Sequence, residues 1–404
     1  MKRYTALVLT VVMLFFVLAG CTAKDAGDAA GREPTADGGG AVHKIGVATY
    51  NVRDAQIRMF KEYLDNYIGQ SFSDVEFLYS DTISSGEEMM DFLGSCAENG
   101  VEGIMLFNSY DLEKEIEFCA EKKMYAIRPA GTFSDEEFDV VASNPYFLGQ
   151  IGPGIQNEYE EGAKMARAMA GQGKSYVICS GGAFMGNEMH RQRTVAMLDV
   201  LQEVHGVSLD QDSETLAMAE QVTEVKAGGL ELVICPGYLD IETFGAAAAE
   251  VIASGAYTTV LSSIPVSALT DTLNSVDIEC GVIDCFSDDN YQGFRKGKIH
   301  YVAGKYESEI GPGFAALYNA ITGNAELYRV DGKAFKLEQG FWIAKSASEY
   351  DSMYGLARGV SVNAYNYEDL RTVIKVMNPE ADFTTFRTLV ESYGYDDCLE
   401  RRSN

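Results

Sequence analysis

Short apolar runs alternate with stretches of helical periodicity along this chain, and that alternation limits the fold more than any other feature of the sequence. Strands buried on both faces of a parallel sheet are continuous apolar runs, and an amphipathic helix connects each strand to the next. A doubly wound α/β sheet is the fold that this order favours. In the first half the pattern predicts strands at 44–49, 75–79, 103–108, 124–128 and 140–143, and helices at 55–68, 86–99 and 112–122.

The same order of strands and helices starts again near Lys174. An apolar strand that closes on a polar turn with a tyrosine occurs in both halves, at 103–110 and 230–238. We therefore predict an α/β protein of two similar doubly wound parallel-sheet lobes, at 43–145 and 146–286. The second set of strands is predicted at 175–179, 215–219, 230–235, 259–263 and 279–285, with helices at 158–169, 191–205, 243–253 and 266–273.

The segment 287–404 belongs to neither repeat. Its pattern predicts one late apolar strand at 336–345 and helices at 307–321, 367–377 and 383–392. Together with the ends of the two lobes, this arrangement predicts three crossings between the lobes and hence a three-strand hinge. Part of 290–404 would complete the first lobe, and the C-terminal helices would return over both lobes.

The N-terminus has the features of a lipoprotein signal. Two cations, Lys2 and Arg3, precede an uncharged run that is too short to span the roughly 30 Å of a bilayer core comfortably. Residues 1–20 are therefore predicted to be a signal peptide. The run ends in the letters LAGC at 18–21, which resemble a bacterial lipobox, where cleavage before the cysteine frees Cys21 for lipid attachment. An ordinary signal peptide with a cysteine near its cleavage site is the alternative.

Lipid attachment at Cys21 would hold the protein in the cell envelope, on the outer face of a bacterial membrane. Residues 21–42 are rich in Ala, Gly and Asp and lack an apolar period, so a flexible tether is predicted to follow the lipidated cysteine. One lipid chain holds a protein only marginally, so stable anchoring implies several chains. The lipid bilayer is thus a predicted partner.

Composition and spacing exclude several classes of function. The formal net charge is −28, and nucleic-acid binding depends on clustered cations, so no nucleic-acid partner is expected. The eight cysteines include no C-x-x-C pair, the four histidines have no metal-binding spacing, and no G-x-S-x-G elbow occurs. We predict no cofactor, no metal, no obligatory disulfide framework and no enzymatic activity. A surface-anchored hydrolase whose catalytic residues meet only in the folded chain stays an alternative.

Polar and aromatic side chains follow the ends of the predicted strands. In open α/β sheets ligands bind beyond the carboxyl ends of the strands, so we predict a ligand site there. We expect Asp284 at the end of the second crossing strand and Arg191 at the start of a helix that faces the cleft. The candidate site residues are Tyr50, Asn51, Asn108, Arg128, Asn144, Phe184, Arg191, Tyr238, Asp284, Gln339 and Trp342.

These residue types suit a sugar or a similar polyol. Carboxylate, amide and guanidinium groups can pair with adjacent hydroxyls, and aromatic faces can cover the C–H side of a sugar ring. Each candidate also has a structural interpretation. For most of them it is a turn or a core edge, for Arg191 a surface salt bridge, and for Trp342 a core position under the hinge.

Several of these features together resemble the type I periplasmic binding proteins, over nearly all of the mature chain. They are the signal with its lipobox, the opening strand KIGV at 44–47, the restart near Lys174, the strand VID at 282–284 and the late segment QGFW at 339–342. Within that family the chain is most similar to the lipid-anchored sugar-binding subunits of ABC importers.

The resemblance implies a function. A small polar ligand, with a sugar as the first expectation, would be held between two lobes that close on it and then be delivered to an ABC permease in the membrane. A nucleoside or a signalling molecule, taken up or read by a membrane sensor, is the alternative for the same fold. A nucleoside site would stack the base between two aromatic side chains.

Overall fold

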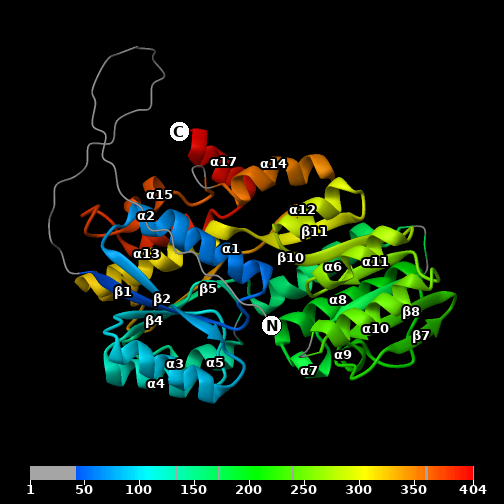
Figure 1. Cartoon of the computed structure of the whole chain (residues 1–404), viewed down its shortest axis with the longest axis horizontal. Coiled ribbons are helices and arrows are strands. Elements are labelled where there is room, and N and C mark those ends of the chain that lie inside the picture. The colour runs from blue at the N-terminus through cyan, green and yellow to red at the C-terminus, as the bar shows by residue number, and fades with distance from the viewer. Residues whose placement is uncertain are drawn as a thin grey trace, which may run out of the picture. The chain divides into compact units, whose positions relative to one another are not determined.

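The computed structural model describes residues 42–132, 134–171, 173, 175–238, 241–359 and 363–403 (Figure 1). The predicted signal peptide, Cys21 and all but the last residue of the predicted tether lie outside the described residues. None of the helices in these ranges has the length and apolar character needed to cross a membrane.

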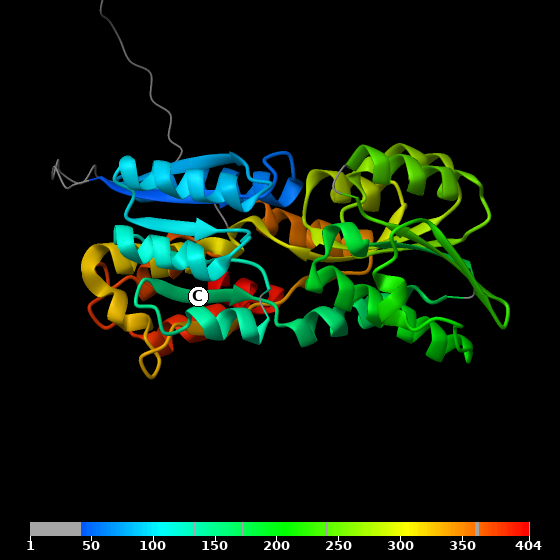
Figure 2. The same cartoon turned by 90° about the horizontal axis from the view of Figure 1, so that it is seen from below.

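Six strands form the sheet of the first lobe, in the order β12-β5-β4-β3-β1-β2, and all neighbouring strands are parallel. One face carries the helices α3 (Gly86–Glu98), α4 (Leu112–Lys122) and α5 (Asp135–Val141), which lie in front of the strands in Figure 2. The other face carries α1 (Ala55–Tyr63) and α13 (Gly311–Asn319). The strands are β1 (His43–Thr49), β2 (Val75–Thr82), β3 (Gly103–Leu106), β4 (Tyr125–Arg128), β5 (Phe147–Gly152) and β12 (Phe335–Glu338).

Consecutive strand residues point into different layers of this lobe. Val47 and Met105 pack in the core that contains Phe60 of α1. Ala48 packs in the separate core that contains Leu93 of α3. Because both faces of the sheet are buried, the strands read as continuous apolar runs in the sequence.

Seven strands form the sheet of the second lobe, in the order β13-β11-β10-β9-β6-β8-β7. The strands β7 and β13 are antiparallel to their neighbours and the others are parallel. The helices α6 (Ile155–Met169) and α8 (Glu188–His205) pack on one face, and α10 (Ile241–Ala253) and α12 (Asp288–Arg295) on the other. The strands are β6 (Ser175–Ser180), β7 (Thr223–Ala227), β8 (Leu230–Pro236), β9 (Thr259–Ser262), β10 (Glu279–Cys285), β11 (Ile299–Lys305) and β13 (Trp342–Ala344).

The two sheets share one strand order, which confirms the predicted fold of two similar α/β lobes. In the first lobe the order is β2-β1-β3-β4-β5, with β12 added from late in the chain. In the second it is β8-β6-β9-β10-β11, with β13 added from late in the chain. Each sheet therefore receives one edge strand from the segment that follows α13.

Two predicted strands are helices. The segment expected as a strand at 140–143 ends α5, whose capping box joins Ser134 and Glu137. The segment expected at 215–219 lies largely in α9 (Ser213–Ala217), which Asp212 caps. Consequently β8, at 230–236, is the second parallel strand of its lobe and corresponds in position to β2 of the first lobe. The strands at 103–110 and 230–238, which the sequence pattern paired, therefore do not occupy equivalent positions in the two lobes.

The chain passes between the sheets after Gly152, after Lys305 and after Glu338, so the predicted number of strand crossings is confirmed. The predicted strands for these crossings were partly wrong. The strand β10, which was expected to lead from the second lobe to the first, does not cross, because β11 follows it in the chain and lies beside it in the same sheet. The strand β11 was not predicted, since its apolar run is short and polar residues flank it. The late strand expected at 336–345 is two strands, β12 and β13, which belong to different sheets.

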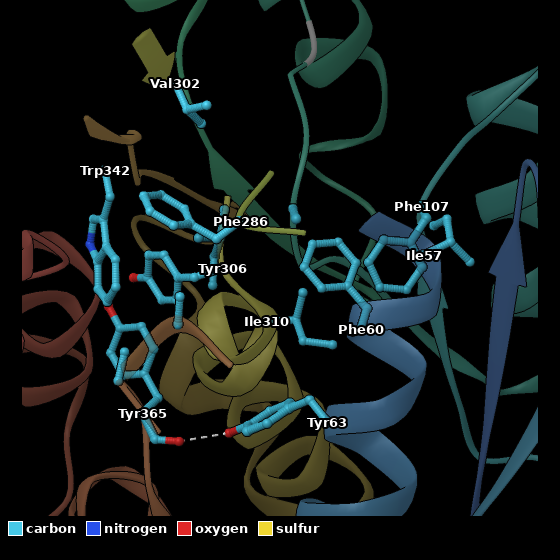
Figure 3. Packing of buried hydrophobic residues seen from close by; sticks show 14 of the residues in the cluster. Ile57, Phe60, Tyr63, Phe107, Phe286, Val302, Tyr306, Ile310, Trp342 and Tyr365 are labelled. Carbon is cyan, nitrogen blue, oxygen red and sulfur yellow. Dashed lines mark hydrogen bonds between the residues drawn. The ribbon is translucent and has the colours of Figure 1, made fainter. Parts of the chain in front are cut away.

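Aromatic side chains fill the hinge (Figure 3). The rings of Tyr306 and Trp342, from the second and third crossings, stack with centroids 4.0 Å apart. Phe286 meets the edge of Trp342 at 5.9 Å. Tyr63 of α1 donates a hydrogen bond from its hydroxyl to the backbone oxygen of Tyr365 at 2.9 Å, drawn as a dashed line in Figure 3. The core thus continues from one lobe into the other through the hinge.

Candidate functional site between the strand ends

The carboxyl ends of the two sheets approach each other where α1 contacts β10. Tyr50 follows β1 of the first lobe, and Asp54 begins α1 four residues later. Asp284 lies near the end of β10 in the second lobe. Burial is the main cause that raises the pKa of Asp284 and of Tyr50, and the charge of Asp54 raises that of Asp284 further. The contact between α1 and β10 therefore places a phenol and a carboxyl of one lobe near a carboxyl of the other.

Asp54 is held firmly by its own lobe. As the N-cap of α1 it accepts hydrogen bonds through Oδ1 from the backbone N–H groups of Gln56 and Ile57, at 2.9 and 3.2 Å. The hydroxyl of Tyr50 donates to the same oxygen at 3.1 Å. Burial raises the pKa of Asp54, while these hydrogen bonds lower it. Capping fixes the direction of the carboxyl at the lobe junction.

Asp284 has a partner within its own lobe. Its Oδ2 accepts a hydrogen bond at 2.8 Å from the side-chain amide of Asn290 on α12, and that amide also donates to the backbone oxygen of Cys285. Burial raises the pKa of Asp284 to about 7, and the charge of Asp54 acts in the same direction. Near neutral pH the carboxyl is thus partly protonated and can both donate to and accept from a hydroxyl.

A buried ion pair lies at the same junction. Glu158 on α6 accepts a hydrogen bond from Nε of Arg193 on α8 at 2.6 Å. The other carboxylate oxygen accepts one at 2.9 Å from the hydroxyl of Thr132, in the loop after β4 of the first lobe. Arg193 also donates to the backbone oxygen of Ser263, after β9, at 3.3 Å. The network therefore links a loop of the first lobe to three elements of the second.

A histidine adjoins this ion pair. The Nδ1 atom of His190 lies 2.7 Å from the backbone oxygen of Ser263. Burial and, to a lesser extent, the charge of Arg193 lower the pKa of His190 to about 3. His190 is neutral over the physiological range and adds no charge to the site.

Arg191 does not face the lobe junction. Its guanidinium pairs with Glu188 at 2.5 Å and also with Glu214, both within the second lobe. Arg193, two residues later, is the arginine that the helix buries. The buried residues His190, Arg193, Thr194 and Met197 follow the spacing of one helix face, and Arg191 lies off that face. This periodicity is the signal that could have identified Arg193.

Phe184 and Tyr238 come together, with ring centroids 5.3 Å apart, beyond the ends of β6 and β8. Phe184 lies in α7 (Gly182–Met185) and is 48% exposed. It borders a cavity of about 520 Å³, together with Thr215 and Gln221. The two aromatic candidates thus form a pair of their own at the strand ends of the second lobe.

Three further candidates, Asn51, Asn108 and Arg128, lie in the first lobe, and two of them interact with groups of that lobe. Asn51 accepts a hydrogen bond from the backbone of Arg53 in the turn after β1. Arg128 has its acidic neighbours, Glu137 and Glu115, in its own lobe, and burial lowers its pKa. Asn108 directs a buried side-chain oxygen to no hydrogen-bond partner among the described residues. Asn108 therefore offers an unused acceptor to a ligand.

The structure places Asn144 away from the other candidates. It lies before the amino end of β5, because the segment expected as a strand at 140–143 ends α5 and the next strand is Phe147–Gly152. There its side chain accepts a hydrogen bond from the backbone of Tyr146 at 2.9 Å. Its backbone oxygen accepts another from Arg329. Parallel strands place this residue at the end of the sheet opposite to the lobe junction.

Gln339 and Trp342 belong to the hinge core. Trp342 is 2% exposed, and its indole N–H donates to the backbone oxygen of Tyr393 at 2.7 Å. The amide of Gln339 donates to the hydroxyl of Tyr365 at 3.2 Å. The hydrogen bonds of both side chains therefore stabilise the third crossing. For Trp342 this agrees with its interpretation as a core position under the hinge.

The sequence-based reasoning missed Glu158 and Asn290 as well as Arg193. Glu158 lies on a helix face with Gly162 and Met165, and its fully buried carboxylate looks like any other helical Glu in the sequence. Asn290 lies in α12, a segment in which no candidate residue was named. Among the described residues there is no group of three His, Cys, Asp or Glu side chains arranged to hold a metal ion.

Solved structures with the same fold are numerous, whereas no family model and no curated protein matches the sequence. A solute-binding protein of an ABC transporter from Burkholderia graminis, in complex with D-arabinose, has a TM-score of 0.55 at 13% identity, over 78% of this chain and 97% of that one. A solute-binding protein from Bacillus halodurans with bound myo-inositol has a TM-score of 0.53 at 14% identity, over 79% and 99%.

A third structure is the periplasmic binding protein of the arabinose ABC transporter from Shewanella sp., bound to α- and β-L-arabinofuranose. It has a TM-score of 0.52 at 14% identity, over 78% of this chain and 95% of that one. These likenesses concern the fold, and they span both lobes because each covers nearly all of the other protein. The chain therefore has the two-lobed α/β fold of the type I periplasmic binding proteins.

Proposed function

We propose that the protein is an extracytoplasmic solute-binding protein that holds a small polar ligand, with a sugar as the first candidate, between its lobes. The observation that carries this proposal is the contact across the lobe junction between α1, which Asp54 caps, and β10, which bears Asp284. Carboxyl and phenol groups from two lobes can bind hydroxyls on both sides of one ring. The similar structures hold arabinose, myo-inositol and arabinofuranose, which supports this class of ligand.

Delivery to an ABC permease is part of the proposal. The similar structures come from ABC transporters. Exposed apolar side chains lie near the strand ends of both lobes, Val52 and Tyr110 on the first and Phe184 and Met185 on the second. Apolar residues at two such rims are suited to contact a membrane partner that recognises both lobes at once. Lipid attachment at Cys21 would keep the protein near that partner.

A thermal-shift screen tests the ligand class. The purified protein is heated with monosaccharides, oligosaccharides and nucleosides in turn. A ligand at 100 times its dissociation constant stabilises the folded state by about 2.7 kcal/mol, so a true ligand raises the melting temperature measurably. Stabilisation by a monosaccharide supports the proposal. Stabilisation by nucleosides alone would replace the sugar with the alternative ligand, and no response to any of the three classes would count against the proposal.

A further inference from the structure

The last helices of the chain contact both lobes. We use the name clasp for α14 (Ala347–Ala357), α15 (Tyr367–Val373), α16 (Phe383–Glu391) and α17 (Tyr395–Ser403). The helix α14 packs against β13 and α12 of the second lobe. The helices α15 and α16 pack against α13 and β12 of the first lobe. In Figure 1 these orange and red helices lie along the same side as α1 and α12.

The clasp is bonded to the hinge between these two attachments. The backbone oxygen of Tyr393 accepts hydrogen bonds from Trp342 at 2.7 Å and from the hydroxyl of Tyr306 at 3.3 Å. It thereby joins the second and third crossings. Tyr365 contributes the backbone oxygen that Tyr63 of α1 contacts (Figure 3). Movement of one crossing relative to the other must disturb these bonds.

Arg358, the residue after α14, makes ion pairs with carboxylates of both lobes. It lies 2.9 Å from Glu62 on α1 of the first lobe and 3.8 Å from Asp288 on α12 of the second. It also lies 3.3 Å from Glu307, which follows the second crossing. The Arg358 side chain is 16% exposed and that of Glu307 is 6% exposed, so solvent screens the contact with Glu307 less than it screens a surface pair. The Glu62 and Asp288 side chains are 51% and 75% exposed, so solvent reaches the acidic ends of the other two pairs.

The two helices that Arg358 joins also carry the candidate site. The N-cap of α1 is Asp54, and α12 provides the Asn290 amide that binds Asp284. Glu62 lies two helical turns beyond Asp54, roughly 12 Å along the axis of α1 at 1.5 Å per residue. A change in the separation of α1 and α12 therefore moves the two carboxyls of the site and strains the Arg358 contacts at the same time.

We propose that the clasp restrains the separation of the two lobes, with Arg358 as the tie, so that the ligand-free protein keeps its site carboxyls close together. With such a restraint, contacts within the folded protein supply part of the free energy that brings the lobes together. A ligand then binds lobes that are already close to each other. This property is independent of what the ligand is.

The experiment measures the distance between the lobes without ligand. Spin labels are attached to cysteines placed at Val140 on α5 and Val204 on α8, which are 53% and 46% exposed. All the cysteines among the described residues are buried, so they do not compete for the label. The full chain is used with Cys21→Ala. Pulsed dipolar spectroscopy then compares the doubly labelled protein with and without Arg358→Gln.

The expected result is a distance distribution that broadens and shifts to longer values in Arg358→Gln. The control is Arg371→Gln, which removes an ion pair with Glu368 within α15. This ion pair does not connect the two lobes, so its loss should leave the distance distribution unchanged. If Arg358→Gln fails to fold, Glu62→Gln removes only the arm to the first lobe, at a side chain that is 51% exposed, and should give the same shift. Equal distributions in the parent, the control and the tie variants would overturn the proposal.

Discussion

Nε of Arg193 lies 2.6 Å from Oε2 of Glu158, although the two side chains are only 4% and 0% exposed. A second pair in the same lobe has the same separation, with Arg167 2.6 Å from Glu203, but its side chains are 53% and 63% exposed. The helices α6 and α8 provide one partner each in both pairs. The two pairs therefore differ chiefly in burial.

This difference predicts unequal costs for one kind of substitution. Arg193→Gln leaves the Glu158 carboxylate buried without its cation, which should lower the free energy of unfolding by about 3–5 kcal/mol. Arg167→Gln removes an exposed pair and should change the urea midpoint far less. Urea denaturation of both variants measures the two effects. A similar midpoint shift in both would mean that the buried pair does not stabilise the lobe junction.

Stability should fall as the pH rises toward 8. Burial is the main cause that raises the pKa of Asp284 and Glu309 to about 7 and that of Glu307 to about 8. The folded state therefore binds more protons than the unfolded state between about pH 4 and 8, and the stability from these carboxyls is lost as the pH rises through 7 to 8.

Asp284→Asn tests this pH dependence by removing one of the three groups. The variant should lose less stability than the parent between pH 5 and pH 8.5 in urea denaturation. Asp289→Asn, at an exposed neighbouring acid on α12, is the control and should keep the parent's pH dependence. An unchanged slope in Asp284→Asn would contradict the assignment of Asp284.

Asp284→Asn should also weaken ligand binding. The exchange keeps the shape but removes charge and turns one acceptor into a donor. Hydrogen bonds to charged groups contribute roughly 1.5 to 3 kcal/mol, so affinity for the ligand found in the screen should fall about 10- to 150-fold. Calorimetric titration measures this change. The melting temperature near neutral pH should not fall, because an Asn oxygen can still accept from Asn290 and the variant has no carboxyl to ionise there. Affinity within about threefold of the parent would remove Asp284 from the site.

Trp342→Phe should lower the melting temperature and leave ligand affinity nearly unchanged, which is the opposite of the result expected for Asp284→Asn. The substitution removes the hydrogen bond to Tyr393 and part of the stack on Tyr306. The loss of one buried hydrogen bond costs about 1–3 kcal/mol, which lowers the melting temperature. Ligand affinity, measured on the same sample, should change little. A large loss of affinity at an unchanged melting temperature would return Trp342 to the ligand site.

Cys21→Ala should release the protein from membranes. The predicted lipid at Cys21 is the proposed anchor, and the substitution removes the thiol that would carry it. Fractionation of cells that produce the parent or the variant measures the share in the membrane pellet. An unchanged share for the variant would contradict the lipobox interpretation.

The fold could be predicted from the sequence because strands buried on both faces leave a continuous apolar signal. The predictions of strands at 140–143 and 215–219 were wrong, because a short apolar run can be either a buried strand or the buried face of a short helix. At 134–137 the capping box of Ser134 and Glu137 was the local signal that would have corrected the first error. The strand β11 was missed because a cationic segment and His300 interrupt its short apolar run.

The candidate site was harder to predict. Asp284 and Tyr50 followed from the rule that ligands bind beyond strand ends, since both lie near such ends. The contact between Glu158 and Arg193 joins residues 35 positions apart on two helices, and no local pattern records which helix faces meet. Arg191 was named and Arg193 was not, although both arginines lie near the start of the same helix and differ there in angular position.

The pairing of β12 with β5 has a consequence for the synthesis of the chain. The strand Phe335–Glu338 completes a sheet whose other strands end at Gly152, and almost the whole second lobe lies between them in the sequence. Until the ribosome has made that strand, β5 is an open edge with unpaired backbone groups, which other chains can join. A product that stops before Phe335 would hold nearly all of the first lobe and still expose that edge, so premature termination should favour aggregation over a stable half-molecule.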